Sequence, residues 1–144
     1  MKSKKIIVVI SLLIFILSFF FTAFKIIDLG EIKDYRSIEV FLIGPISFLG
    51  GGILEFLVWT ANIWFFAAIL GVYRNKYKLS IIIGFISSCI SFSFIFWKEI
   101  LVAENGRMAE IHSLEAGYFL WLFSILFITI SSVYLKLITE KTLI

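Results

Sequence analysis

The sequence has little of what soluble and secreted domains depend on. Its 144 residues include one cysteine, one proline and one histidine, and only 16% of them are charged. A single cysteine cannot close a disulfide within the chain, which excludes a disulfide scaffold. The scarcity of charge excludes a disordered tail, because disordered segments are rich in charged and polar residues.

Apolar residues are abundant instead. They make up 61% of the chain, and its mean hydropathy is +1.07. A chain of 16.6 kDa has too little interior to bury so much apolar surface. The composition therefore excludes a soluble enzyme and predicts a membrane protein. The net charge of +3 does not indicate nucleic-acid binding, because the bases lie between apolar runs and not on one soluble face.

Four apolar runs are long enough to cross a bilayer. At 1.5 Å per residue, runs of about 20 residues match a hydrocarbon core of about 30 Å. Helices are expected, since lipid offers no partner for an unpaired backbone group. We therefore predict an all-α integral membrane four-helix bundle, a single domain over 1–144, with alternating helix directions. The second and third spans should be central and the first peripheral. The four spans are 6–24, 53–73, 79–97 and 116–135.

The start of the chain resembles a signal peptide, because three lysines precede the first apolar run. That run is longer than the usual 7–15 residues, and it ends without a small-x-small cleavage site. We predict an uncleaved anchor.

Basic residues are distributed unevenly between the two sides. The two tails and the loop 74–78 carry eight bases and one acid, whereas the other side carries five bases and nine acids. Short loops rich in lysine and arginine stay in the cytoplasm. We therefore expect a multi-pass protein with both termini cytoplasmic.

Two outer loops break the regular pattern. In the loop 25–52, the apolar stretch 40–49 is too short to span, and Gly44-Pro45 should interrupt a helix there. We interpret this stretch as an interfacial cap on the bundle. A shallow re-entrant piece, or a lid hinged on Gly50-Gly51-Gly52, is the alternative.

The second outer loop, 98–115, contains Glu104-Asn105-Gly106-Arg107. Asn-Gly favours a tight turn, which predicts a short exposed hairpin. Alternatively, the third span continues and ends with Gly106 as its C-terminal cap.

Polar residues inside the spans are few. Asn62 lies near the middle of the second span, where its amide must bond to another helix. Its role is to hold helices together or to line a substrate path. Glu55 could remain solvated at the helix start or turn inward as a proton or cation acceptor. Ser87 and Ser91 belong to a stripe of small residues that allows close helix packing or lines a path.

The sequence offers no convincing catalytic, cofactor-binding or metal site. His112 has Glu104, Glu110 and Glu115 nearby, but neither a helix nor a strand puts all four on one face. No nucleophile motif, phosphate loop or Cys-x-x-Cys pair is present. The sequence leans away from an enzyme without settling the question.

Two short elements carry a resemblance. Trp59-Thr60-Ala61-Asn62 follows a glycine-rich entry into the second span, and Gly117-Tyr118-Phe119-Leu120-Trp121-Leu122 opens the last. In these elements the chain resembles small four-helix proteins of the bacterial inner membrane to which no activity is assigned. The resemblance implies a bacterial inner-membrane location and four helices, and it supplies no activity.

Two classes of function remain. The first is a non-enzymatic membrane protein that acts through a protein partner, as an accessory or immunity-type protein. The second is an oligomeric small transporter or channel component, since four helices rarely enclose a path alone. The bilayer and a protein partner, or a second copy of the chain, are the expected partners. Outer-loop candidates for partner contact are Glu104, Arg107, Glu110, His112 and Glu115.

Overall fold

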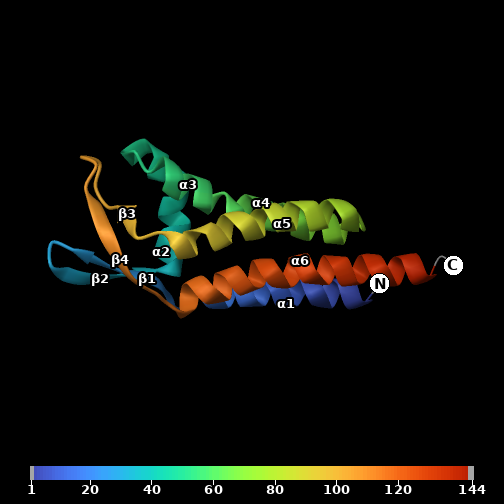
Figure 1. The fold of residues 1–144 in the computed structure, drawn as a ribbon. Coiled ribbons are helices and arrows are strands. Elements are labelled where there is room, and N and C mark those ends of the chain that lie inside the picture. Colours follow the sequence, from blue (N-terminus) through green and yellow to red (C-terminus); the bar gives the residue numbers. More distant parts are fainter. Residues whose placement is uncertain (1, 143–144) are drawn as a thin grey trace.

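The structure is a computed structural model that describes residues 2–142. Long helices lie side by side, and a sheet closes one end of them, while both ends of the chain lie at the other end (Figure 1). In chain order the elements are α1 (Lys2–Ser18), β1 (Thr22–Asp28), β2 (Glu31–Arg36), α2 (Ser37–Ile43), the 3-10 helix η1 (Gly44–Gly50), α3 (Ile53–Trp59), α4 (Ala61–Tyr73), α5 (Tyr77–Ser93), the 3-10 helix η2 (Phe94–Phe96), β3 (Glu99–Leu101), β4 (Met108–Leu114) and α6 (Ala116–Thr142).

The all-α prediction is wrong, because the chain also forms a four-stranded antiparallel sheet. Its strand order is β2-β1-β4-β3. The hairpin expected in 98–115 is present as β3 and β4, but it pairs with β1 from the other outer loop. Two loops on the same side of a bundle can satisfy their backbone groups by pairing with each other. Separate inspection of each loop could not reveal that pairing.

The first apolar run changes structure before it ends. The helix stops at Ser18, whose hydroxyl donates to the Phe15 carbonyl (2.6 Å). Residues 22–24, predicted to lie in the span, instead begin β1. Aromatic and β-branched residues suit a strand, and apolar content alone does not separate the two structures.

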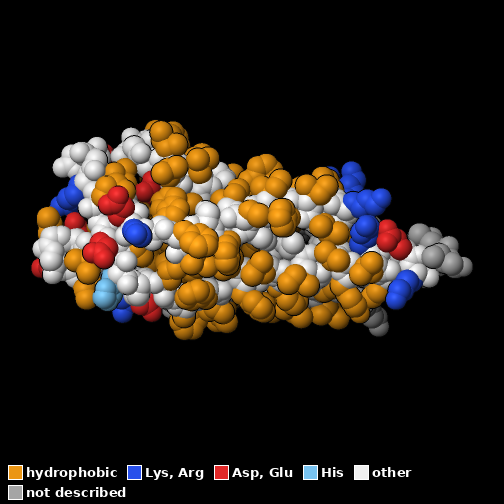
Figure 2. Space-filling model, in the orientation of Figure 1, with side chains coloured by type: hydrophobic (Ala, Val, Ile, Leu, Met, Phe, Trp, Pro, Cys, Tyr) orange, Lys and Arg blue, Asp and Glu red, His pale blue; other side chains and the backbone are white. Residues whose placement is uncertain are grey.

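Among the described residues 2–142, three helices are long and apolar enough to cross a membrane: Ile53–Tyr73, Tyr77–Phe96 and Ala116–Lys141. The predicted first span, 6–24, is not one of them, because its helix α1 has only 17 residues. The helix Ile53–Tyr73 consists of α3 and α4, which meet at Thr60, and α3 tilts away from the direction of α4 (Figure 1). On the face drawn in Figure 2, apolar side chains cover most of the helices, bases gather at the end near the termini, and mixed charges lie over the sheet.

The central helices are α5 and α6. α5 packs along α4 and α6, and α6 also packs along α1, whereas α4 touches α1 and α6 only slightly. The prediction that the second span is central was therefore wrong. Small serine side chains lie at the contacts of the two central helices. Ser80 and Ser87 of α5 bond to α4, and Ser124 and Ser132 of α6 are fully buried.

The stretch 40–49 forms the end of α2 and most of η1. Gly44-Pro45 does not stop the helix but converts it from α to 3-10 geometry. Gly51, with φ +90, then turns the chain back so that α3 packs against η1. The segment lies at the sheet end of the bundle (Figure 1).

Buried side chains form two cores. One lies between the helices and includes Phe15, Phe65 and Ile125. The other lies between the sheet and the ends of the helices and includes Phe24 and Tyr118. The candidate site lies where these two cores meet.

Candidate functional site

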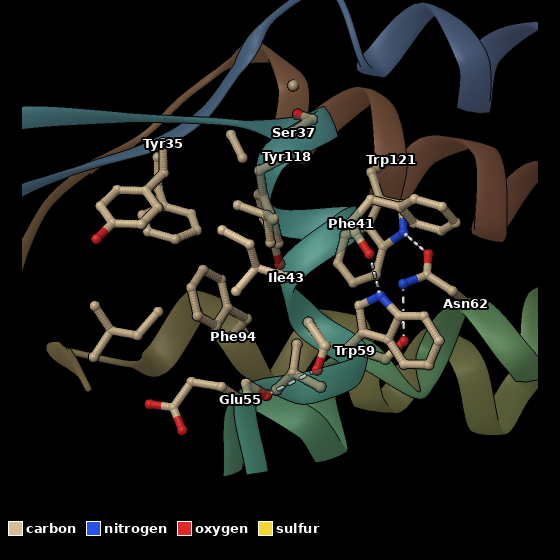
Figure 3. A pocket seen from close by; sticks show the side chains of 18 of the residues that line it. Tyr35, Ser37, Phe41, Ile43, Glu55, Trp59, Asn62, Phe94, Tyr118 and Trp121 are labelled. Atoms are coloured by element: carbon tan, nitrogen blue, oxygen red, sulfur yellow. Dashed lines mark hydrogen bonds between the residues drawn. The ribbon is translucent and has the colours of Figure 1, made fainter. Parts of the chain in front are cut away.

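A cavity of about 180 Å³ lies at the junction of the sheet and the helices. It brings together segments from both outer loops and from α3, α4 and α6 (Figure 3). Its wall is mostly apolar and rich in aromatic rings. The residues in the wall are Ser18, Phe19, Ala23, Phe24, Tyr35, Ser37, Val40, Phe41, Ile43, Gly44, Ser47, Glu55, Val58, Trp59, Asn62, Phe94, Ile100, Leu101, Gly117, Tyr118 and Trp121.

Asn62 lies in this wall, and its side chain is 4% exposed. Its Nδ2 amide donates to the Trp59 carbonyl (2.8 Å), and its Oδ1 accepts from the Trp121 indole (2.8 Å). The Trp59 indole in turn donates to the Phe41 carbonyl (2.9 Å). Figure 3 shows this chain of bonds from α6 through α4 and α3 to α2. The expectation that Asn62 bonds to another helix is confirmed.

Glu55 also lies in the wall. Its Oε1 accepts a hydrogen bond from the Leu101 amide (2.9 Å), so it fastens α3 to β3. The sequence predicted either a solvated carboxylate at the helix start or an inward acceptor of a proton or cation. A hydrogen bond from a backbone amide of the second outer loop was not predicted. The sequence held no sign of this hydrogen bond, because Leu101 in the loop 98–115 is distant from Glu55 along the chain.

Ser87 and Ser91 do not line the cavity. The Ser87 hydroxyl donates to the Ala61 carbonyl (2.8 Å) across the α4–α5 contact. The Ser91 hydroxyl donates to Ser88 within α5, and the Ser91 carbonyl accepts from the Tyr118 hydroxyl (2.8 Å). Both serines therefore contribute to helix packing.

The five outer-loop candidates occupy different environments. Glu110 and His112 are exposed at alternate positions of β4, and Glu104 is exposed in the β3–β4 turn. The other two are engaged within the sheet: Arg107 bonds to Asp28 (3.4 Å), and Glu115 accepts from Ser113 (2.7 Å) and lies 3.9 Å from Lys25.

Asp28 is a buried acid that sequence reasoning missed. It is 4% exposed at the end of β1, and its Oδ2 accepts from the Lys33 ammonium (2.7 Å) and from Arg107. The hydrogen bond from Lys33, with the positive charge of Arg107, holds the pKa of Asp28 below its ordinary value against the opposing effect of burial. The same bond raises the pKa of Lys33.

The outer face of the sheet carries an unneutralised acidic pair. Glu99 and Glu110 are directly opposite each other on β3 and β4, and both are exposed. Within residues 2–142, neither carboxylate lies within ion-pair distance of a base. Like charges at opposed positions destabilise a strand pair, so this pair does not stabilise the sheet.

Among residues 2–142, no group of three or more His, Cys, Asp or Glu side chains could hold a metal ion. His112 lies on the exposed side of β4, outside the cavity.

The two elements that carry the sequence resemblance meet in the cavity wall. Trp59 and Asn62 come from the first, and Gly117, Tyr118 and Trp121 come from the second. No family model, curated protein or solved structure matches the chain. We therefore infer the function from geometry and chemistry.

Proposed function

We propose that this chain is a non-enzymatic membrane protein that binds a protein partner through the exposed face of its sheet, as an accessory or immunity-type protein does. The opposed Glu99 and Glu110 carboxylates carry the proposal. Their repulsion costs stability in the free protein, and a basic surface on a partner would remove that cost.

The proposed setting is the bacterial inner membrane, which the chain crosses more than once, with both termini in the cytoplasm. The bases gathered near the termini support it, because such bases mark the cytoplasmic side (Figure 2). In this orientation the sheet stands on the outer surface, where a periplasmic or membrane-embedded partner would reach it.

The polar groups of the spans favour this proposal over an oligomeric transporter. Hydroxyls at Ser80, Ser87 and Ser132 bond to neighbouring helices or to their own helix, and Asn62 bonds to Trp59 and Trp121. Within the described residues, no buried hydroxyl of the long helices lacks a partner. Groups that line a substrate path must be free to exchange partners, and these are not.

A pull-down from native membranes tests the proposal. Tagged protein is cross-linked, extracted in mild detergent and analysed by mass spectrometry. We expect one stoichiometric heterologous partner, and we expect the double reversal Glu99→Lys with Glu110→Lys to remove it at unchanged expression. The matched control is the reversal Glu140→Lys, an exposed acid at the opposite end of the bundle, which should retain it.

Recovery of only self-cross-links at a fixed multiple would contradict partner binding and support the oligomeric transporter. Retention of the same partner by the sheet variant would place the interface elsewhere and contradict the role of the acidic pair.

A further inference from the structure

One row of opposed residues crosses all four strands on the exposed face of the sheet. From β3 to β2 its members are Glu99, Glu110, Ile27 and Ile32. Directly opposed residues project to the same face of a sheet, so the two carboxylates and the two isoleucines form one continuous strip. The acidic half of the strip lies on β3 and β4, and the apolar half lies on β1 and β2.

The apolar half continues into the turn between β1 and β2. Ile32 is 59% exposed, and Leu29 in the turn is 79% exposed. This turn lies at the end of the molecule opposite the termini, beyond the ends of the long helices (Figure 1). Exposed apolar side chains on the helices face lipid in the proposed orientation, whereas Ile27, Leu29 and Ile32, here called the hairpin patch, face water. Neighbouring apolar side chains that are exposed to water mark a binding surface.

Leu29 also has a backbone conformation that leucine rarely adopts. Asp28 and Glu31 are opposite each other, so Leu29 and Gly30 form a two-residue turn, and their φ angles are +54 and +84. Such a turn favours Asn, Asp or Gly at its first position, because the Cβ of other residues crowds the backbone at positive φ. In the free protein Leu29 therefore strains the turn and buries little apolar surface in return. A partner that covers the side chain would account for both features.

We propose that the hairpin patch binds an apolar surface of the heterologous partner, and that basic side chains beside that surface reach Glu99 and Glu110. The inference rests on the proposed partner binding and adds the chemistry of the partner's surface, which is apolar over β1 and β2 and cationic over β3 and β4. A second copy does not fit, because pairing of two such faces would bring four carboxylates together. Lys25, the base of the neighbouring row, already lies 3.9 Å from both Asp34 and Glu115.

Leu29→Asn separates binding from folding. Asparagine suits a positive φ and removes the apolar side chain, so the variant should unfold at a higher temperature than the unaltered protein. It should nevertheless recover about tenfold less partner in the cross-linked pull-down, as expected when an exposed contact residue is lost. Leu137→Asn is the matched control, because it makes the same change at a leucine that is 53% exposed near the end of α6, and it should leave partner recovery unchanged. A lower unfolding temperature for Leu29→Asn would show that the leucine stabilises the turn and would overturn the inference.

Ile32→Thr tests the strand half of the hairpin patch. Threonine keeps the β-branched shape that suits a strand, so the hydrogen-exchange protection of β1 and β2 should stay the same while partner recovery falls several-fold. Full recovery by both Leu29→Asn and Ile32→Thr, together with loss in Glu99→Lys with Glu110→Lys, would overturn this inference and leave the proposed function in place. Absence of any heterologous partner from the unaltered protein would overturn both.

Discussion

At the scale of single residues, hydrogen bonds to tryptophan and serine determine how the helices meet. Asn62 of α4 links Trp59 of α3 to Trp121 of α6, with hydrogen bonds of 2.8 Å on each side. The sequence predicted that this amide must have a partner on another helix, because an unpaired amide in hydrocarbon is costly. It could not predict that the partner is an indole, since two tryptophans in the same region fit equally well as packing residues.

Asn62→Leu should reduce the free energy of unfolding by about 1–2 kcal/mol, because it leaves the Trp121 indole without an acceptor. Denaturant titration in mixed micelles measures this quantity. Trp121→Phe removes the same bond from the other side, so the double variant should lose less than the sum of the two single variants. Simple additivity would mean that the bond does not link the helices.

The stability of the sheet should depend on pH through the ionisation of Asp28. Its pKa is lower in the folded protein, mainly through the hydrogen bond from Lys33. The ion pair therefore adds stability above the unfolded pKa of about 4, and that stability is lost as the pH falls through the folded value. The hydrogen-exchange protection factors of β1 and β2, which compare each amide with its intrinsic rate at the same pH, should fall below about pH 4 in the unaltered protein. Asp28→Asn should show faster exchange at neutral pH and a flatter response to acid; identical profiles would refute the role of this carboxylate.

At the scale of elements, α2 and η1 join the sheet to the helices. Gly44 permits the contact, because a Cβ at this position would overlap the Trp59 indole. The sequence predicted a helix break at Gly44-Pro45 and an interfacial segment. The break is only a change to 3-10 geometry, since Gly44 keeps right-handed helical angles with φ −49 and ψ −41.

Gly44→Ala should destabilise this junction by about 1–3 kcal/mol, since an added methyl must displace the indole. The Trp59–Phe41 bond should then weaken, visible as faster exchange of the indole N–H by NMR in detergent. Gly50→Ala is the control, because a Cβ at that position would meet only the Glu104 side chain at an ordinary 3.4 Å. Equal effects of the two substitutions would show that the Trp59 contact is unimportant.

The type of an element could be predicted from the sequence where residues close together in the chain determine it. Long apolar runs predicted the long helices, and Asn105-Gly106 predicted the β3–β4 hairpin. The rest depends on contacts between distant segments. β1 lies at the end of an apolar run that suits a helix equally well, and β2 lies in a mixed charged loop. β1 becomes a central strand only because β4 of the other outer loop pairs with it.

At the scale of the whole molecule, the face drawn in Figure 2 has mixed charges at the sheet end, an apolar zone along the helices and cationic side chains at the other end. Of the sequence-predicted site residues, Asn62 and Glu55 lie in the cavity wall, Ser87 and Ser91 pack helices, and Glu110 and His112 face outward on the sheet. Asp28 was not predictable, since its importance comes from burial by segments distant in sequence.

The most direct test of partner binding is site-specific photo-crosslinking in native membranes. A benzophenone amino acid replaces His112, which is exposed next to Glu110 on β4, or Ile130, which is 68% exposed on α6. We predict a single heterologous cross-linked protein from position 112 and none from position 130. The absence of a heterologous product at position 112, or the same product at both positions, would contradict a partner that binds the sheet.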